Sequence, residues 1–293
     1  LLSRRQRQMC IRDSSVCHCC GSACCLFSGK TDENHLGDGN HQRTVTAVMS
    51  RYKHRKKRAM RTLRKTIFRL LLLAVAAAVM AGCVLIGRGY QMYQAALTQQ
   101  SLESKVEELQ SDSSYTELLE LPEMYLNAVV AVEDHRFEQH FGIDLIAIGR
   151  AAWNNLTTWS LREGGSTITQ QLAKNMYFTQ EKSFIRKVAE MFMAFRLERT
   201  YTKDEILELY VNSIYFGDGY YGIGDACEGY LNESPIEMTD YECTLMAGIP
   251  NAPSVYSLTE NPALAEQRQK YVVRQMVKYG YITEDQARQL QNK

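Results

Sequence analysis

The stretch that decides the fold reads AVVAVEDHRFEQHFG at residues 128–142. An apolar run with helical character ends abruptly at Glu133 and Asp134, and His140 and Gly142 follow shortly after. A carboxylate at the end of an apolar run is partly withdrawn from water, which suits it to exchange protons near neutral pH. This stretch alone leaves open the alternative that Glu133 is an ordinary acidic residue at a helix end.

A second polar stretch, GGSTITQQLAKN, occupies residues 164–175 and begins with a flexible glycine pair. Thr167 and Gln170 have the spacing of a capping box, which predicts that a helix begins here. The free backbone N–H groups and positive dipole end of such a helix suit a phosphate. Lys174 lies two turns along and can reach the same anion. A well-capped helix with a solvated lysine is the alternative.

A third group is Arg186, Lys187 and Glu190, which share one face if residues 184–200 form a helix. An exposed ion pair is the alternative, and such pairs contribute little stability. The other face carries an apolar stripe that we expect to face the core, made of Val188, Phe192 and Phe195.

Taken together, these stretches resemble the motifs of the peptidoglycan glycosyltransferases (glycosyltransferase family 51), enzymes that polymerise lipid II into glycan strands. The motifs are long and in the family's order, and the resemblance runs from about Pro122 to the C-terminus. Two positions depart from the family pattern. Cys227 stands where alanine is usual, and Ser257 follows Tyr256 where proline is common. Neither position carries charge, so neither affects the predicted chemistry.

The resemblance implies a mainly α fold, with a lysozyme-like glycosyltransferase domain and a small membrane-facing lobe near residues 143–163. It assigns catalysis to Glu133, as the base, and to Glu190, as a second carboxylate that positions cations or reacting groups. It assigns substrate binding to the polar residues of the three motifs: Asp134, Phe137, His140, Gly165, Ser166, Thr167, Gln170, Gln171, Lys174, Asn175, Arg186 and Lys187.

The implied reaction joins a sugar hydroxyl of lipid II to the anomeric carbon of the growing strand and releases undecaprenyl diphosphate. Cations held against the diphosphate stabilise its developing charge. No nucleophile for a double displacement is evident, so we expect inversion and β-1,4 linkages. No cofactor is required; a divalent cation, Mg²⁺ or Mn²⁺, stays open as an aid, but no ligand cluster in the sequence demands one.

An apolar stretch at residues 67–86 follows a segment, residues 49–66, that is dense in lysine and arginine. Its length suits a bilayer span, and the positive-inside rule places the basic flank in the cytoplasm. A buried core helix and a cleaved signal peptide are the alternatives. Met80-Ala-Gly-Cys83 also resembles a weak lipoprotein processing box.

The chain therefore divides as follows. Residues 1–48 look foreign or disordered and contain a cysteine cluster without the paired Cys-x-x-Cys geometry of a structural zinc site. The basic segment and the span come next, then a polar stalk at 87–121, and then the catalytic domain at 122–293. Within 143–161 the sequence contains Trp153 and Trp159, which belong either to the core or to the membrane interface.

We expect a single-pass bacterial membrane protein whose partners are lipid II, the growing glycan strand, membrane lipid and cell-wall synthesis proteins. The net charge of +1 gives no support to nucleic-acid binding. Three alternatives remain: a lysozyme-like muramidase, a non-enzymatic membrane scaffold, and the N-terminal part of a bifunctional penicillin-binding protein. Beyond the apolar span the sequence contains no Ser-x-x-Lys, the signature of a transpeptidase.

Overall fold

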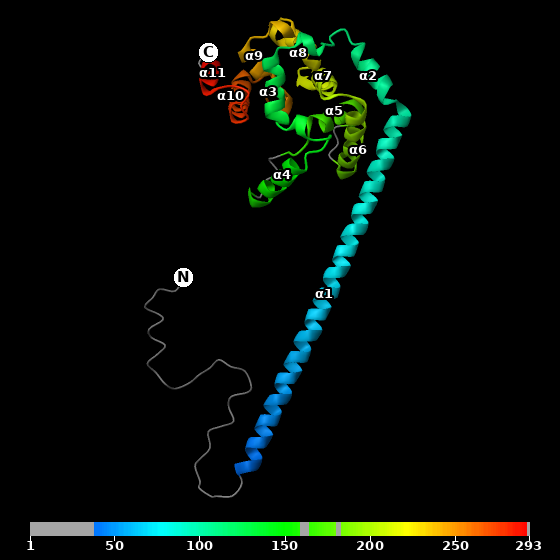
Figure 1. The fold of residues 1–293 in the computed structure, drawn as a ribbon, viewed down its shortest axis with the longest axis vertical. Helices are drawn as coiled ribbons and strands as arrows, with labels where there is room; N and C mark the ends of the chain where they lie inside the picture. The colour runs from blue at the N-terminus through cyan, green and yellow to red at the C-terminus, as the bar shows by residue number, and fades with distance from the viewer. Residues whose placement is uncertain (1–37, 159–163, 180–182, 292–293) are drawn as a thin grey trace, which may run out of the picture. The chain divides into compact units, whose positions relative to one another are not determined.

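The computed structural model describes residues 38–158, 164–179 and 183–291, and in these ranges the chain is mainly helical (Figure 1), which confirms the predicted fold class. The helices are α1 (Asp38–Gln99), α2 (Leu102–Gln110), α3 (Glu123–Glu133), α4 (Leu145–Thr158), α5 (Ile168–Tyr177), α6 (Phe184–Thr200), α7 (Lys203–Ser213), α8 (Gly222–Leu231), α9 (Asp240–Met246), α10 (Pro262–Lys278) and α11 (Glu284–Gln291). Two short antiparallel strands, β1 (Tyr215–Gly217) and β2 (Tyr220–Tyr221), form a hairpin. Short 3₁₀ turns are η2 (Leu118–Glu120), η3 (Phe137–Gln139), η4 (Pro235–Glu237) and η5 (Ile249–Asn251).

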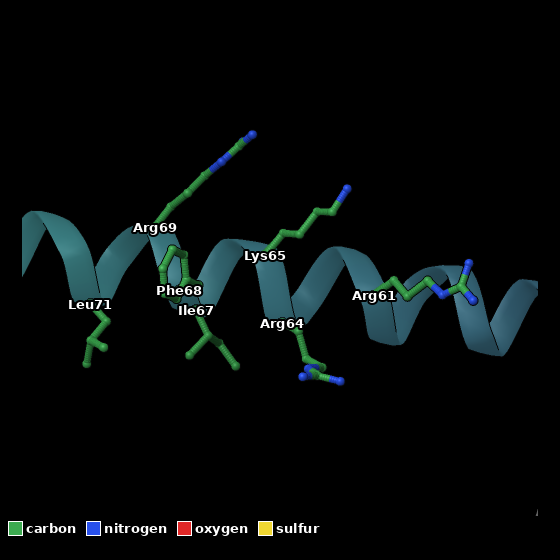
Figure 2. A pocket seen from close by; sticks show the side chains of 7 residues that line it. All are labelled: Arg61, Arg64, Lys65, Ile67, Phe68, Arg69 and Leu71. Atoms are coloured by element: carbon green, nitrogen blue, oxygen red, sulfur yellow. The ribbon is translucent and has the colours of Figure 1, made fainter.

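The chain forms two compact units, Leu1–Leu73 and Ala74–Lys293. In the described part of the first unit, α1 carries the basic segment. Figure 2 shows side chains from this helix at the point where cations such as Arg61 and Lys65 give way to apolar residues such as Ile67 and Leu71. By length and composition, α1 is the one described helix able to cross a membrane, with a mean hydropathy of 2.7 in its most apolar window.

The N-terminal prediction is tested only in part. Residues 1–37, including the early cysteine cluster, lie outside the described residues. Residues 38–48, which we expected to be foreign or disordered, form the first turns of α1; they are therefore ordered, and whether they are foreign stays a prediction. Cys83 is exposed, whereas Cys227 and Cys243 are buried, and all three are free thiols.

The segment predicted as a stalk packs on the domain in the structure. Leu102, on α2, is 1% exposed and belongs to the main hydrophobic core. The Tyr115 hydroxyl donates a hydrogen bond to Glu208 (2.6 Å), and the Thr116 backbone N–H donates one to Asn212 (2.9 Å). The catalytic domain therefore begins earlier than residue 122, because much of the polar segment before it is held by α7.

The core of the second unit lies among α3, α5, α6, α7, α9 and α10. Helix α5 packs against α6 and α7, while α3 packs against α9 and α10. Tyr125, Phe137, Tyr210 and Phe216 are the largest side chains that the structure buries completely. Burial of such rings supplies much of the apolar stabilisation of a domain.

Capping boxes set the starts of three helices in this unit. Thr167 and Gln170 bond reciprocally at the start of α5, as the sequence predicts, and Thr202 and Glu205 do so at the start of α7. Thr239 caps α9 in the same way. Each box satisfies backbone N–H groups that a helix end otherwise leaves unpaired, so the polar motif residues also fix where the site's helices begin.

Helix α4 exposes most of its apolar side chains. Leu145, Ile146, Trp153 and Leu156 are between 66% and 76% exposed, and the only residue of this helix that the structure buries is Ala151. The interpretation of Trp153 as a core residue is therefore wrong. Trp159 lies outside the described residues. An exposed apolar patch of this kind is typical of an interaction surface.

Candidate active site

A cleft of about 600 Å³ opens beside the last turn of α3, where Glu133 ends the apolar run. Its walls come from α3, α4, the start of α5, the turn around η5, and α10. Four of its lining residues were expected from the sequence motifs: Glu133, Ser166, Gln171 and Lys174. These residues are far apart in sequence, and the packing of α3 and α5 brings them to one cavity.

Glu133 is held by one hydrogen bond and keeps one oxygen free. The side-chain amide of Gln171 donates to Glu133 Oε2 (2.8 Å), and the amide oxygen of Gln171 accepts from the buried Tyr210 hydroxyl (3.4 Å). Glu133 Oε1 is buried and has no hydrogen-bond partner among the residues that the structure describes. The carboxylate is therefore oriented at one oxygen and available as an acceptor at the other.

Asp134, next to the candidate base, points into the protein. Its Oδ2 lies 2.8 Å from Nε2 of His140 and accepts a hydrogen bond from the backbone N–H of Ile168 (3.1 Å), the first residue of α5. The Asp134 side chain is only 5% exposed. One carboxylate thus ties the first motif to the beginning of the second, which fixes Glu133 opposite α5.

Five residues predicted to bind substrate are buried away from the cleft. They are Asp134, Phe137, His140, Thr167 and Gln170. Phe137 is 0% exposed, and the Thr167 hydroxyl donates to the carbonyl of Gly142 (2.7 Å). The side chains of the four polar residues form hydrogen bonds with other residues of the two motifs. Gly165 and Asn175 are half-buried and do not line the cleft.

Lys174 connects the cleft with the third motif. It lines the cavity, and burial lowers the pKa of its ammonium group from the ordinary value of 10.5. The carboxylates of Glu190 and Glu133 oppose this shift, while Lys187 and Arg186 add to it. Lys174 therefore lies within electrostatic range of both predicted catalytic carboxylates.

Glu190 is fully buried on α6 and is neutralised by two cations. Its Oε1 lies 2.8 Å from Nε of Arg186, and its Oε2 accepts a hydrogen bond from Lys187 Nζ (2.7 Å). Arg186 also donates to the backbone carbonyl of Thr179 (2.7 Å). The predicted shared face of these three residues is confirmed, but none of them lines the cleft.

The apolar stripe of α6 differs from the prediction. Phe192 packs against Tyr90 and Tyr93 of α1, with ring centroids 5.3 and 5.9 Å apart. Phe195 is 36% exposed and stacks on Phe141. The residues of α6 that do face the core are small or flexible ones: Ala189, Met193, Ala194 and Leu197.

The site residues predicted from the sequence do not include the opposite wall of the cleft. Helix α10 presents Arg268, Tyr271, Gln275 and Lys278 to the cavity, at steps of three or four residues. Arg150, on α4, adds a further cation. A polar stripe at helical spacing was the available signal, but a solvated helix face has the same pattern.

Aromatic contacts shape this wall. The Arg268 guanidinium lies 4.6 Å from the centroid of the Tyr271 ring, and its Nε is buried without a hydrogen-bond partner in the described chain. His135 stacks on Tyr279 with ring centroids 3.9 Å apart. Burial, aided by the charge of Arg150, lowers the pKa of His135. Among the residues that the structure describes, the cleft lining contains four lysine and arginine side chains and one carboxylate, that of Glu133.

Within the described ranges, no group of three or more histidine, cysteine, aspartate or glutamate side chains could hold a metal ion. The anion-binding capacity that the structure displays resides in lysine and arginine side chains. Arginine can contact phosphate oxygens through two N–H groups at once, and lysine contacts them as a point charge.

Comparisons with known proteins agree with the motifs. A family model described as "Transglycosylase" matches residues 99–277. Penicillin-binding protein 1A of Neisseria gonorrhoeae is 43% identical over 178 residues, covering 61% of this chain and 22% of that protein. Penicillin-binding protein 1A of Aquifex aeolicus is 43% identical over 179 residues, covering 61% of this chain and 25% of that protein.

A shorter relative is covered more fully. A Cupriavidus necator protein provisionally named a transglycosylase is 43% identical over 169 residues, covering 58% of this chain and 73% of the relative. By contrast, the chain spans only about a fifth to a quarter of the length of the penicillin-binding proteins. The match from residue 99 also agrees with a domain that begins before residue 122.

Proposed function

Because the chain belongs to the transglycosylase family, we propose that it is a peptidoglycan glycosyltransferase that polymerises lipid II into β-1,4 glycan strands and releases undecaprenyl diphosphate. One observation carries the proposal: Glu133 lines a cationic cleft with one oxygen anchored by Gln171 and the other without a partner.

Glu133 acts as the general base in this proposal. Its unpaired Oε1 accepts the proton of the sugar hydroxyl while the hydroxyl oxygen attacks the anomeric carbon. The hydrogen bond from Gln171, itself bonded by Tyr210, holds the carboxylate in one orientation. Such preorientation lowers the barrier because the base need not be ordered during the reaction.

The leaving diphosphate is stabilised by cations. Lys174 supplies one charge inside the cleft, and Arg186 and Lys187 extend the positive charge along α6. Glu190 is fully buried between its two partners, which supports a positioning role for this carboxylate. Because Glu133 is the one carboxylate that lines the cleft among the described residues, we expect a single displacement with inversion at the anomeric carbon.

We further propose that α1 anchors the protein in the bacterial cell membrane in a single pass, with its basic flank in the cytoplasm and the cleft outside. The length and hydropathy of α1 and the one-sided charge support this orientation. The exposed apolar face of α4, which includes Trp153, provides a second contact with the lipid surface. The substrate then reaches the cleft without leaving the bilayer.

The test is polymerisation of fluorescent lipid II by the full chain in detergent, compared with a Glu133→Gln variant. We expect polymer from the parent and at least a hundredfold slower polymerisation by the variant, since general-base catalysis contributes about 10²- to 10⁴-fold. A Glu138→Gln variant serves as a control, because Glu138 is exposed and does not line the cleft. If the parent instead degraded finished glycan, the muramidase alternative would replace the proposal.

A further inference from the structure

Gly89, near the end of α1, makes an unusually close approach to α6. A Cβ atom placed on Gly89 would lie 2.5 Å from Val188 Cγ1, 2.6 Å from Val188 Cβ and 3.1 Å from the Ile185 carbonyl oxygen. Real side chains do not tolerate the first two distances, and Val188 cannot turn aside because a β-branched side chain in a helix has one strongly preferred rotamer. Glycine is therefore required here by the packing of two helices.

The contact continues along α1 as a stripe at helical spacing. Tyr90 and Tyr93 lie against the Phe192 ring, and Met92, Tyr93, Ala96 and Leu97 pack against the core. Along α6, Ile185, Val188 and Phe192 form the facing row. The end of the candidate membrane helix is thus seated on the same helix that carries Arg186, Lys187 and Glu190.

The position of this contact along α1 bears on how deep in the membrane interface the cations of α6 would lie. The apolar stretch ends at residue 86, and Gly89 lies three residues farther, which is about 4.5 Å at the helical rise of 1.5 Å per residue. The headgroup layer on each side of a bilayer is roughly 5–7 Å thick. Val188, which touches Gly89, is the immediate neighbour of Lys187. With the apolar stretch in the bilayer, this contact would place Val188, and with it the cations of α6, near the level of the lipid phosphates.

We propose that Gly89 is a positioning residue: its contact with Val188 fixes the height of the domain on the membrane helix, so that the cations of α6 meet a diphosphate still anchored in the bilayer. The inference rests on the proposed function. It concerns how the lipid-linked substrate is met, and it does not assign any chemical step to Gly89. Helix α6 is locked into the domain by fully buried residues such as Met193 and Leu197, so added bulk at Gly89 displaces the domain as a whole.

The test compares Gly89→Ala with Gly87→Ala in the full chain reconstituted into phospholipid vesicles. Gly87 is a matched control because it lies on the same helix, two residues away, and has no atom within 4 Å of an added Cβ. Each variant is assayed with lipid II of full tail length in the bilayer and with a short-tailed, water-soluble lipid II. The expected displacement is roughly 1 Å, and an error of that size in placing reactants can lower the rate by about a hundredfold.

We expect Gly89→Ala to lower kcat/KM at least about tenfold for the bilayer substrate while the soluble substrate keeps its rate within about twofold. Gly87→Ala should match the parent on both. The double variant Gly89→Ala/Val188→Gly removes the two atoms that collide and should restore bilayer activity. Equal loss on both substrates would mean ordinary structural damage, and no loss on either would mean that the contact has no role; each result overturns the inference while the parent still polymerises.

A second measurement is independent of catalysis. The sequence contains two tryptophans, Trp153 and Trp159, so quenching of tryptophan fluorescence by lipids brominated at different depths reports the height of this part of the domain. Gly89→Ala should shift the quenching profile relative to the parent, and Gly87→Ala should not. An unchanged profile overturns the inference even if the parent is inactive, and an inactive parent with a shifted profile would instead count against the proposed function.

Discussion

Replacing Glu190 with glutamine tests how the third motif is held together. Glu190 is 0% exposed and lies 2.8 Å from Arg186 Nε and 2.7 Å from Lys187 Nζ. Removing one partner of a buried ion pair typically costs about 3–5 kcal/mol, because the remaining charge is left without compensation. The Lys187 side chain is 42% exposed, so water screens its share and the lower end applies. We expect the free energy of unfolding to fall by about 3 kcal/mol.

The assay is urea unfolding followed by circular dichroism, with lipid II polymerisation in parallel. For a domain of this size, about 3 kcal/mol corresponds to a fall of roughly 6–12 °C in Tm. Glu108→Gln is the matched control: it makes the same chemical change in an exposed i,i+3 ion pair with Lys105 and should leave the free energy of unfolding nearly unchanged. Polymerisation should slow by about a hundredfold, since the cations lose their fixed positions. A Glu190→Gln variant as stable as the parent would refute the argument.

Two further substitutions probe the cleft and its support. Because burial lowers the pKa of Lys174, the unfolded chain binds the Lys174 proton more tightly than the folded chain, and the free energy of unfolding rises with pH between that lowered pKa and 10.5. Lys174→Met should therefore be more stable than the parent at pH 7 and should not show this rise. Urea unfolding at pH 7 and pH 10 measures both effects. Asp134→Ala removes the hydrogen-bond partner of His140 and of the Ile168 N–H, and chemical denaturation should show a free energy of unfolding lower by about 2–3 kcal/mol. The control Asp112→Ala, at an exposed carboxylate, should change little. Equal stability of the two variants would contradict this prediction.

The sequence predicted best where a local rule decides the structure. The capping box at Thr167 forms as its spacing indicates, since a cap depends on four consecutive residues. The shared face of Arg186, Lys187 and Glu190 follows in the same way from helical geometry. The mainly α fold needs little more than such local signals.

The sequence could not distinguish residues that line the cleft from residues that are buried behind it. Asp134 and His140 stand beside Glu133 in one motif, yet they bond to each other and to the start of α5, out of the cleft. A polar residue in a motif looks the same whether its partner is a ligand or a backbone N–H group. Only tertiary packing, which turns Glu133 outward and Asp134 inward, decides between the two.

The sequence also did not predict that α10 forms one wall of the cleft, or that the segment before residue 122 packs on the domain. Arg268 and Lys278 reach the cleft because α10 packs against α3, a contact between residues more than a hundred positions apart. Gly89 is a second example, since the sequence does not show why a glycine is required at this position. The requirement comes from Val188, which lies across the interface between α1 and α6. Long-range contacts of this kind leave no periodic signal in the chain.

The distribution of charge favours glycosyl transfer from a diphosphate over hydrolysis of a glycan. Hydrolysis by two carboxylates requires both to face the sugar, about 5–10 Å apart, so that the second can attack or can activate water. In the part of the chain that the structure describes, Glu133 is the only carboxylate lining the cleft, and Glu190 is fully buried between two cations. A carboxylate neutralised in this way is a poor nucleophile and a poor base for water. A reaction that releases an anion, such as a diphosphate leaving group, gives these cations a role beyond neutralising Glu190.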